Sequence, residues 1–304
     1  KYRYRHPSYY TYMDVYPFRC TNKQINWITI IMSDAYAVIG NPIIHSKSPL
    51  IHTAFSKQTK QKMHYKALFA PLNGFAEAIK VFRKNNGKGM NVTTPFKFDA
   101  YKISTQLTEH AEAAQAVNTL LFNSNEIYGH NTDGIGLIRD IVTNLGFAIT
   151  AKRILICGAG GAASGIILPL LQKNPSTLVI SNRTVQKAYK LQDQFSSFNN
   201  IIVANDNMDI AKREFDLVIN ATSTSLIGKS LILPRNIFAS GSLAYDLMYS
   251  NKQTPFLKFA QKEGAEYLSD GTGMLVEQAA ESFFLWRGIR PKTKEIIKNI
   301  RNGS

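Results

Sequence analysis

The stretch KRILICGAGGAASGIILPLL, residues 152–171, decides the fold of this chain. Its pattern predicts a buried apolar strand, a Gly-rich turn and an apolar helix, which is how a dinucleotide-binding α/β unit begins. Gly158 allows the tight turn, Gly160 lets a pyrophosphate approach the backbone, and Ala163 takes the sixth position, where alanine is accepted. The helix N-terminus offers unpaired N–H groups to a phosphate. A plain strand–helix turn is the alternative interpretation.

The end of the following strand, STLVISN at 176–182, indicates which dinucleotide would bind. An NAD site carries Asp or Glu at this point for the ribose hydroxyls, whereas this chain has Asn182, Arg183 and Thr184. The planar guanidinium of Arg183 suits a 2′-phosphate, and Asn182 and Thr184 add hydrogen-bond donors. The stretch therefore favours NADP(H) over NAD(H), the alternative being an exposed arginine at a helix start.

Apolar strands and amphipathic helices alternate along the rest of the chain, which is typical of α/β layers. A helix is expected from Thr184, and the end of the chain over 273–299 is expected to be helical. The expected strands cover 35–40, 64–70, 89–94, 215–223 and 243–249, and a hairpin turns at 123–125.

Two serines, Ser46 and Ser48, mark the start of a predicted helix in the stretch HSKSPLIHTAF. We expect Ser48 to be the N-cap, with Pro49 in the first turn. The apolar face is expected to hold Leu50, Ile51, Ala54 and Phe55. Hydroxyl groups beside a helix N-terminus can bind a carboxylate. The alternative is one N-cap serine and one turn serine.

Three polar residues, Lys97, Asn118 and Asp133, lie at or just after predicted strand ends. Ligands of open α/β sheets collect at the carboxyl ends of strands, so these side chains suggest hydrogen bonding to a polyhydroxylated ligand. Lys97 and Asp133 can also form a proton-transfer pair. A structural ion pair is the alternative, and spacing by itself does not separate the two.

The composition excludes several classes of protein. The net charge is +15, yet the basic residues are scattered and no RRM, KH or zinc-finger pattern occurs, so we expect no nucleic-acid partner. No apolar run approaches the length that spans a bilayer, so no membrane partner is expected. Two cysteines, Cys20 and Cys157, cannot build a disulfide framework or a zinc site. We expect a cytoplasmic protein without a metal.

Residues 1–31 differ from the rest, being rich in Tyr and Arg and without a clear period. Ordered patterning begins after Met32. Our hypothesis is that Met32 is the natural start and that 1–31 is a non-native or disordered extension.

Several longer motifs now identify a family. The chain resembles the shikimate dehydrogenases from about Ala35 to Gly288. The matching stretches, in chain order, are YAVIGNPIIHSKSP, NVTTPFK, AVNTL, HNTDG, GAGGAA, NRT, INATS, YDLMY, TPFL and DGTGMLVEQAAESFFLW.

This resemblance implies an α/β fold with two domains. An N-terminal α/β domain that binds substrate and carries the catalytic residues would cover 32–133 and 271–304, with the last helices returning to it. A Rossmann-like NADP-binding domain would cover 134–270. The partners would be small molecules, and the protein a monomer or homodimer.

The resemblance also assigns site residues. Lys97 and Asp133 would be the catalytic pair. The substrate would contact Ser46, Ser48 and Tyr249 on its carboxylate side and Thr93, Asn118 and Gln278 at its ring hydroxyls. The NADP(H) contacts would be Gly158, Ala159, Gly160, Gly161, Ala162, Asn182, Arg183, Thr184, Thr222, Ser223, Met248, Gly271 and Met274.

The implied reaction is the reversible reduction of 3-dehydroshikimate to shikimate by NADPH, a step of chorismate and aromatic amino-acid biosynthesis. Two alternatives stay open. One is a quinate/shikimate dehydrogenase that prefers NAD, against which Asn182, Arg183 and Thr184 argue. The other is a non-catalytic sensor of the same pathway, against which the presence of both Lys97 and Asp133 argues.

Overall fold

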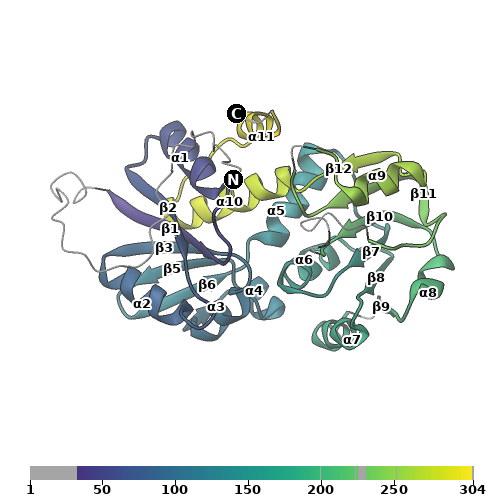
Figure 1. The fold of residues 1–304 in the computed structure, drawn as a ribbon, viewed down its shortest axis with the longest axis horizontal. Helices are drawn as coiled ribbons and strands as arrows, with labels where there is room; N and C mark the ends of the chain where they lie inside the picture. The colour runs from purple at the N-terminus through teal and green to yellow at the C-terminus, as the bar shows by residue number, and fades with distance from the viewer. Residues whose placement is uncertain (1–32, 199, 223, 225–230, 251, 303–304) are drawn as a thin grey trace, which may run out of the picture.

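The computed structural model describes residues 33–198, 200–222, 224, 231–250 and 252–302. The hypothesis for residues 1–31 lies outside this part of the chain. Figure 1 shows two α/β bodies side by side, each built on its own sheet, with the helices α5 and α10 between them. Among the described residues, no helix is long and apolar enough to cross a membrane.

The first sheet has the strand order β2-β1-β3-β5-β6-β4. Strands β1, β2 and β3 are parallel, whereas β5 runs antiparallel to both β3 and β6. The predicted hairpin at 123–125 is the β5–β6 turn. The strands are β1 (Asp34–Gly40), β2 (Met63–Phe69), β3 (Gly87–Val92), β4 (Gln106–Leu107), β5 (Thr119–Asn123) and β6 (Glu126–His130).

The helices of this body are α1 (Ser48–Thr59), α2 (Phe75–Lys84), α3 (Lys97–Ile103) and α4 (Glu109–Ala114). Two details of α1 were predicted wrongly. Its N-cap is Lys47 rather than Ser48, because the Ser48 side chain is buried and makes no capping hydrogen bond. Leu50 is 51% exposed, since the buried face of α1 runs through Ile51 and Phe55 instead.

The second sheet has the order β12-β11-β10-β7-β8-β9, and its neighbouring strands are paired in parallel. The order reverses between β7 and β10, the type of position at which open α/β sheets bind ligands. Its strands are β7 (Arg153–Cys157), β8 (Thr177–Ser181), β9 (Ile201–Ala204), β10 (Phe215–Asn220), β11 (Phe238–Asp246) and β12 (Tyr267–Ser269). Its helices are α6 (Gly161–Leu171), α7 (Val185–Gln194), α8 (Asn207–Ala211) and α9 (Pro255–Lys262).

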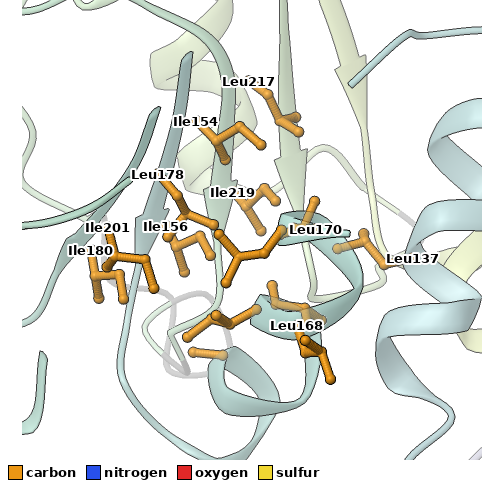
Figure 2. Close-up of a cluster of buried hydrophobic side chains, with 14 of the residues drawn as sticks. Leu137, Ile154, Ile156, Leu168, Leu170, Leu178, Ile180, Ile201, Leu217 and Ile219 are labelled. Carbon is orange, nitrogen blue, oxygen red and sulfur yellow. The ribbon is translucent and has the colours of Figure 1, made fainter. Parts of the chain in front are cut away.

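The core of the second body confirms the strand–turn–helix prediction for 152–171. Helix α6 is apolar almost all round and lies against the sheet, where buried leucine and isoleucine side chains meet (Figure 2). Burying one such side chain contributes about 1.5–3 kcal/mol. Those labelled from the strands and α6 include Ile154, Ile156, Leu168, Leu170, Leu178 and Ile219.

Two segments connect the bodies. The first is α5 (Asp133–Arg139), which continues into a single π-helical turn, η2 (Asp140–Asn144), and leads to β7. The second is α10 (Thr272–Arg287), which returns to the first body and is followed by α11 (Lys294–Arg301). The helical end expected over 273–299 is confirmed as two helices with a break between them, because α10 stops at Gly288 with φ +69° and Pro291 follows.

An aromatic cluster fixes α1 to the rest of the first body. His52 of α1 is fully buried and stacks on Tyr65 of β2, with ring centroids 4.1 Å apart, and lies 5.3 Å from Trp286 of α10. Within the described residues, neither ring nitrogen has a hydrogen-bond partner of acceptable geometry. Burial lowers the pKa of His52 to about 3, and the nearby Asn91 side chain opposes that shift only in part.

This burial predicts how stability depends on pH. In the unfolded chain His52 binds a proton below pH ~6.5, whereas in the folded chain it stays neutral down to about pH 3. The free energy of unfolding should therefore fall as the pH falls through this window, by up to about 1.4 kcal/mol per pH unit from this group. His52→Phe should remove that component, as measured by urea unfolding between pH 7 and 4. His64→Phe, at an exposed position, controls for the substitution. Equal slopes in wild type and His52→Phe would contradict the prediction.

Candidate active site

Three neighbouring strands of the first sheet place Lys97, Asn118 and Asp133 together. Lys97 begins α3 soon after β3 ends, and Asp133 begins α5 soon after β6 ends. Asn118 was expected after a strand end, but it directly precedes β5. Because β5 is antiparallel to β3 and β6, its amino end lies at the carboxyl ends of its neighbours. The three side chains therefore still meet at one edge of the sheet.

Lys97 and Asp133 form an ion pair between the lysine Nζ and Asp133 Oδ2. Their side chains are 16% and 8% exposed, so both charges lie largely out of water. Desolvation makes such a pair costly unless further hydrogen bonds satisfy it, and removing one partner leaves a buried, unpaired charge. The backbone N–H of Val117 also donates to the Lys97 carbonyl at 2.9 Å, which ties the start of α3 to the chain before β5.

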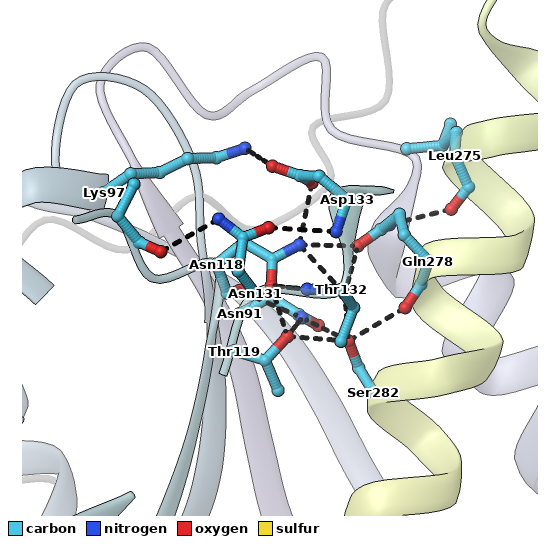
Figure 3. A network of polar contacts seen from close by, with 11 residues as sticks. Asn91, Lys97, Asn118, Thr119, Asn131, Thr132, Asp133, Leu275, Gln278 and Ser282 are labelled. Atoms are coloured by element: carbon cyan, nitrogen blue, oxygen red, sulfur yellow. Dashed lines mark hydrogen bonds and ion pairs between the residues drawn. The ribbon is translucent and has the colours of Figure 1, made fainter. Parts of the chain in front are cut away.

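Asn118 supplies those further hydrogen bonds, as Figure 3 shows. Its Nδ2 donates to Asp133 Oδ1 at 2.8 Å and to Thr132 Oγ1 at 2.9 Å. Its Oδ1 accepts from the backbone N–H of Thr132 at 2.9 Å. Gln278 of α10 completes the group, since its Oε1 accepts from Asn118 Nδ2 at 3.4 Å. The predicted residues Lys97, Asn118, Asp133 and Gln278 thus form one network.

A second layer of polar side chains lies beneath this network and was not predicted. Asn91 Nδ2 donates to Thr119 Oγ1 at 3.1 Å and to Ser282 Oγ at 3.0 Å, and Asn91 Oδ1 accepts from the Tyr65 hydroxyl at 2.7 Å. Asn91, Thr119 and Ser282 are buried. The sequence signal that could have found them is their place in two of the motifs, Asn91 in NVTTPFK and Thr119 in AVNTL. Their contacts to α10 are long-range and have no sequence signature.

The proposed carboxylate binders lie where α1 begins. Ser46 Oγ accepts from the backbone N–H of Ser48 at 3.3 Å, so the two serines are adjacent. Burial raises the pKa of Tyr249 in the second body, and the backbone of Lys47, between the two serines, opposes that rise. The Tyr249 phenol therefore lies near the start of α1. Thr93 is half-buried, with its methyl group close to Gly40.

The Gly-rich turn has the geometry that a pyrophosphate requires. Gly158 adopts φ +121°, and a Cβ there would lie 2.9 Å from the Ala221 carbonyl oxygen, so both the conformation and the space demand glycine. Gly160 is the N-cap of α6, and a Cβ added to it would meet nothing within 4 Å. The backbone is therefore open at the N-terminus of an 11-residue helix. Ala159 and Ala162 flank this turn and are half-buried.

The same turn lies close to Lys97. A Cβ placed on Gly161 would lie 3.6 Å from Lys97 Cβ and 3.7 Å from Phe98 Cζ. The nucleotide end of the second body thus lies directly against α3 of the first. Phe98, which is 45% exposed, was not predicted to lie near this turn, because nothing in the local pattern distinguishes it from an ordinary surface aromatic residue.

The residues expected at a 2′-phosphate follow β8. Asn182 Nδ2 donates to the Thr184 carbonyl oxygen at 2.8 Å, which orders the start of α7. Arg183 and Thr184 are exposed. In the part of the chain that the structure describes, Arg183 forms no ion pair with an acidic residue, so its guanidinium is free to meet an anionic group.

The remaining predicted cofactor residues lie at the carboxyl ends of β10 and β11 and at the start of α10. Thr222 Oγ1 donates to Asn220 Oδ1 at 2.7 Å. The backbone N–H of Met248 donates to Asp246 Oδ1 at 3.1 Å, and the N–H of Gly271 donates to the Met248 carbonyl at 3.0 Å. Ser223 lies outside the described residues. Met274 is 8% exposed in the first turn of α10.

These residues fit NADP(H). The open backbone at Gly160 and the α6 N-terminus suit a pyrophosphate, and Arg183 suits a 2′-phosphate. Because Gly161 lies close to Lys97, a dinucleotide on this turn would lie beside the Lys97–Asp133 pair. The arrangement can therefore combine hydride chemistry with proton transfer at one place.

Comparison with known proteins gives three matching family models. The shikimate dehydrogenase substrate binding domain matches residues 38–120. The shikimate / quinate 5-dehydrogenase model matches 140–237, and the shikimate 5′-dehydrogenase C-terminal domain matches 271–301.

Individual relatives match over nearly nine tenths of this chain. The protein named shikimate dehydrogenase (NADP(+)) of Nitrosospira multiformis is 58% identical over 271 residues, which is 89% of this chain and 98% of the relative. The crystal structure of an enzyme from Pseudomonas putida matches with a TM-score of 0.83 and 44% identity, covering 88% of this chain and 98% of that one. Shikimate 5-dehydrogenase from Thermus thermophilus, solved with NADP(H) and shikimate, matches with a TM-score of 0.79 and 27% identity, covering 89% and 100%.

Proposed function

The chain belongs to the shikimate dehydrogenase family, and we propose that it catalyses the reversible reduction of 3-dehydroshikimate to shikimate with NADPH. One observation carries this proposal beyond the family. The buried Lys97–Asp133 pair lies close to the Gly-rich turn, since a Cβ on Gly161 would be 3.6 Å from Lys97 Cβ, so an acid–base group and a dinucleotide cradle share one site.

We assign residues 32–133 and 271–304 to a substrate-binding catalytic domain and 134–270 to a Rossmann-like NADP-binding domain. The two separate sheets support this division, and so does the return of α10 to the first body. Either a monomer or a homodimer is expected. Cys157 is a buried free thiol whose pKa burial raises to about 12, which suits a reducing cytoplasm.

The substrate is proposed to bind with its carboxylate at Ser46, Ser48 and Tyr249. This placement is supported by the contact of Tyr249 with Lys47, which brings residues of both bodies to the start of α1. The ring hydroxyls would then face Thr93, Asn118 and Gln278. Asn118 and Gln278 already hydrogen-bond with each other, so they offer a preorganised set of donors and acceptors.

The cofactor is proposed to lie along the carboxyl edge of the second sheet. NADPH, when bound, supplies the hydride. Arg183 would pair with the 2′-phosphate, and Asn182 and Thr184 would lie beside it. The pyrophosphate would be held by Gly158, Ala159, Gly160, Gly161 and Ala162, and the nicotinamide side would be lined by Thr222, Ser223, Met248, Gly271 and Met274.

Lys97 is proposed to move the proton. In the reducing direction its Nζ donates a proton to the ketone oxygen as negative charge develops there. In the oxidising direction the neutral amine accepts the hydroxyl proton. Asp133 orients Lys97 through the ion pair and is itself oriented by Asn118. A positioned acid–base group of this kind contributes about 10²–10⁴ in rate.

A direct assay tests the proposed function. The purified protein should oxidise shikimate with NADP⁺, followed as an increase in absorbance at the wavelength of NADPH, and should do so poorly with NAD⁺ or with quinate. Faster turnover with quinate and NAD⁺ would identify an NAD-preferring quinate/shikimate dehydrogenase. Binding of shikimate without turnover on any pair would indicate a sensor and overturn the proposal.

Lys97→Ala should lower kcat by about 10² or more with a smaller change in KM, because the lysine acts mainly in the transition state. Steady-state kinetics with shikimate and NADP⁺ measure this. Lys102→Ala is the matched control, since Lys102 lies on the same helix with its side chain 73% exposed. A large rise in KM with kcat intact would make Lys97 a binding residue instead.

Arg183→Ala should weaken NADPH binding about 10- to 100-fold, since a hydrogen bond to a charged group contributes about 1.5–3 kcal/mol. NADH lacks the 2′-phosphate, so its affinity should change little. Fluorescence titration with both cofactors measures the difference, and Arg213→Ala, at an exposed position of the same body, is the control. An equal loss for the two cofactors would count against the 2′-phosphate assignment.

A further inference from the structure

Both connections between the bodies pass through one buried polar cluster outside the proposed active site. Asp140 is the first residue of η2, directly after α5, and Met274 lies in the first turn of α10. Helices α5 and α10 pack against each other along this path. Tyr245 reaches both segments from β11 of the second sheet. Asp140 and Tyr245 are fully buried.

The Tyr245 hydroxyl joins the two connections. It donates to Asp140 Oδ2 at 2.7 Å and accepts from the backbone N–H of Met274 at 3.3 Å. This N–H belongs to the first turn of α10, where helix N–H groups have no partner within the helix. One phenol oxygen therefore fixes the end of the first connection and the beginning of the second to the same strand.

The Asp140 carboxylate fits into a space that is shaped for it. A Cβ on Gly273 would lie 1.9 Å from Asp140 Oδ1, so only glycine at this position leaves room for the carboxylate against α10. Burial raises the pKa of Asp140, and the hydrogen bonds from Asn144 and Tyr245 oppose that rise. Leaving such a buried acceptor without a donor is costly, which makes each donor consequential.

A second link runs parallel to the first. Asn144 Nδ2 donates to Asp140 Oδ1 at 2.9 Å and to Glu277 Oε1 at 3.1 Å. Glu277 of α10 also accepts from Thr293 Oγ1 at 2.7 Å and lies 3.7 Å from Arg139 Nε. The π-helical turn and α10 are therefore connected twice, through Tyr245 and through Asn144.

The helices that this cluster holds are the ones that carry two residues of the proposed site. Asp133 begins α5, about 10 Å along the helix from Asp140 at 1.5 Å per residue. Gln278 lies one turn beyond Met274 on α10 and contacts Asn118. A change in the position of either helix start would move Asp133 or Gln278 relative to Lys97.

We propose that Asp140 and Tyr245 are positioning residues, which fix α5 and α10 to the nucleotide-binding sheet and thereby hold Asp133 and Gln278 in place for the reaction. This inference rests on the proposed function for its kinetic consequence. The hydrogen bonds themselves do not depend on it.

Tyr245→Phe removes the hydroxyl and keeps the ring. It should lower kcat about 10- to 100-fold, because small displacements of catalytic groups are costly. The dissociation constant of NADP⁺ should change less than kcat does, since the Gly-rich turn and Arg183 are untouched and only Met274, on the nicotinamide side, loses a hydrogen bond. Tyr267→Phe is the matched control on the neighbouring strand β12, where Tyr267 is 53% exposed, and it should retain wild-type kinetics.

A second variant distinguishes the proposed effect from a general loss of folding. Asn144 is exposed, and Asn144→Ala removes its hydrogen bonds to Asp140 and Glu277. This variant should also lower kcat, but by less than Tyr245→Phe does. In the double variant the effects of the two substitutions on kcat should be non-additive, because both substitutions act through Asp140. Normal kcat in Tyr245→Phe together with a lower melting temperature would show a merely structural role and overturn the proposal.

Hydrogen exchange separates this inference from the proposed function. The Met274 amide should exchange faster in Tyr245→Phe than in wild type, whether or not the protein oxidises shikimate. Inactive wild-type protein with this change would overturn the function and leave the linkage between the two connections intact. Active wild-type protein with unchanged exchange and unchanged kcat in the variant would overturn the inference alone.

Discussion

The ion pair between Lys97 and Asp133 is the constraint on which the rest of this structure depends. Both charges are largely removed from water, and that placement is favourable only with good geometry and additional hydrogen bonds. Asn118 provides them from the strand between those that lead to the two partners. The alternation of strand directions in β3, β5 and β6 therefore has a chemical consequence, because it brings three side chains from distant sequence positions to one edge.

The second body completes this site instead of merely adjoining it. Gly161 lies close to Lys97, and Tyr249 lies near the backbone of Lys47, between Ser46 and Ser48. A shared site between two bodies requires that their relative position be held accurately, since reacting groups lose much of their advantage when displaced by about 1 Å. Only two segments connect the sheets in the described chain, and the buried contacts of Tyr245 and Asp140 lie where these segments meet.

Features with local causes were predicted correctly from the sequence. The Gly-rich turn was predictable because a strand, a turn and a helix follow one another directly, and Gly158 adopts the φ that only glycine takes easily. Features that depend on burial, which decides between similar residues, were predicted wrongly. Ser48 has the chemistry of an N-cap, yet its side chain is buried, and Leu50 was expected on a face that in fact points to solvent. The break after Gly288 was also missed, because the apolar pattern continues on both sides of it.

By itself, the sequence determined the α/β class and the dinucleotide turn. It also predicted a preference for NADP(H) over NAD(H) from Arg183, and it identified Lys97 and Asp133 as a candidate pair. These features depend on residue type and short spacing, which a linear pattern carries. The tertiary structure decided how Asn118 and Gln278 bond with Asp133 and with each other, that Asn91, Thr119 and Ser282 support this group from below, and that Tyr245 ties both connections to one strand. These contacts join residues far apart in the chain, and their partners are selected by strand direction and by the packing of α10.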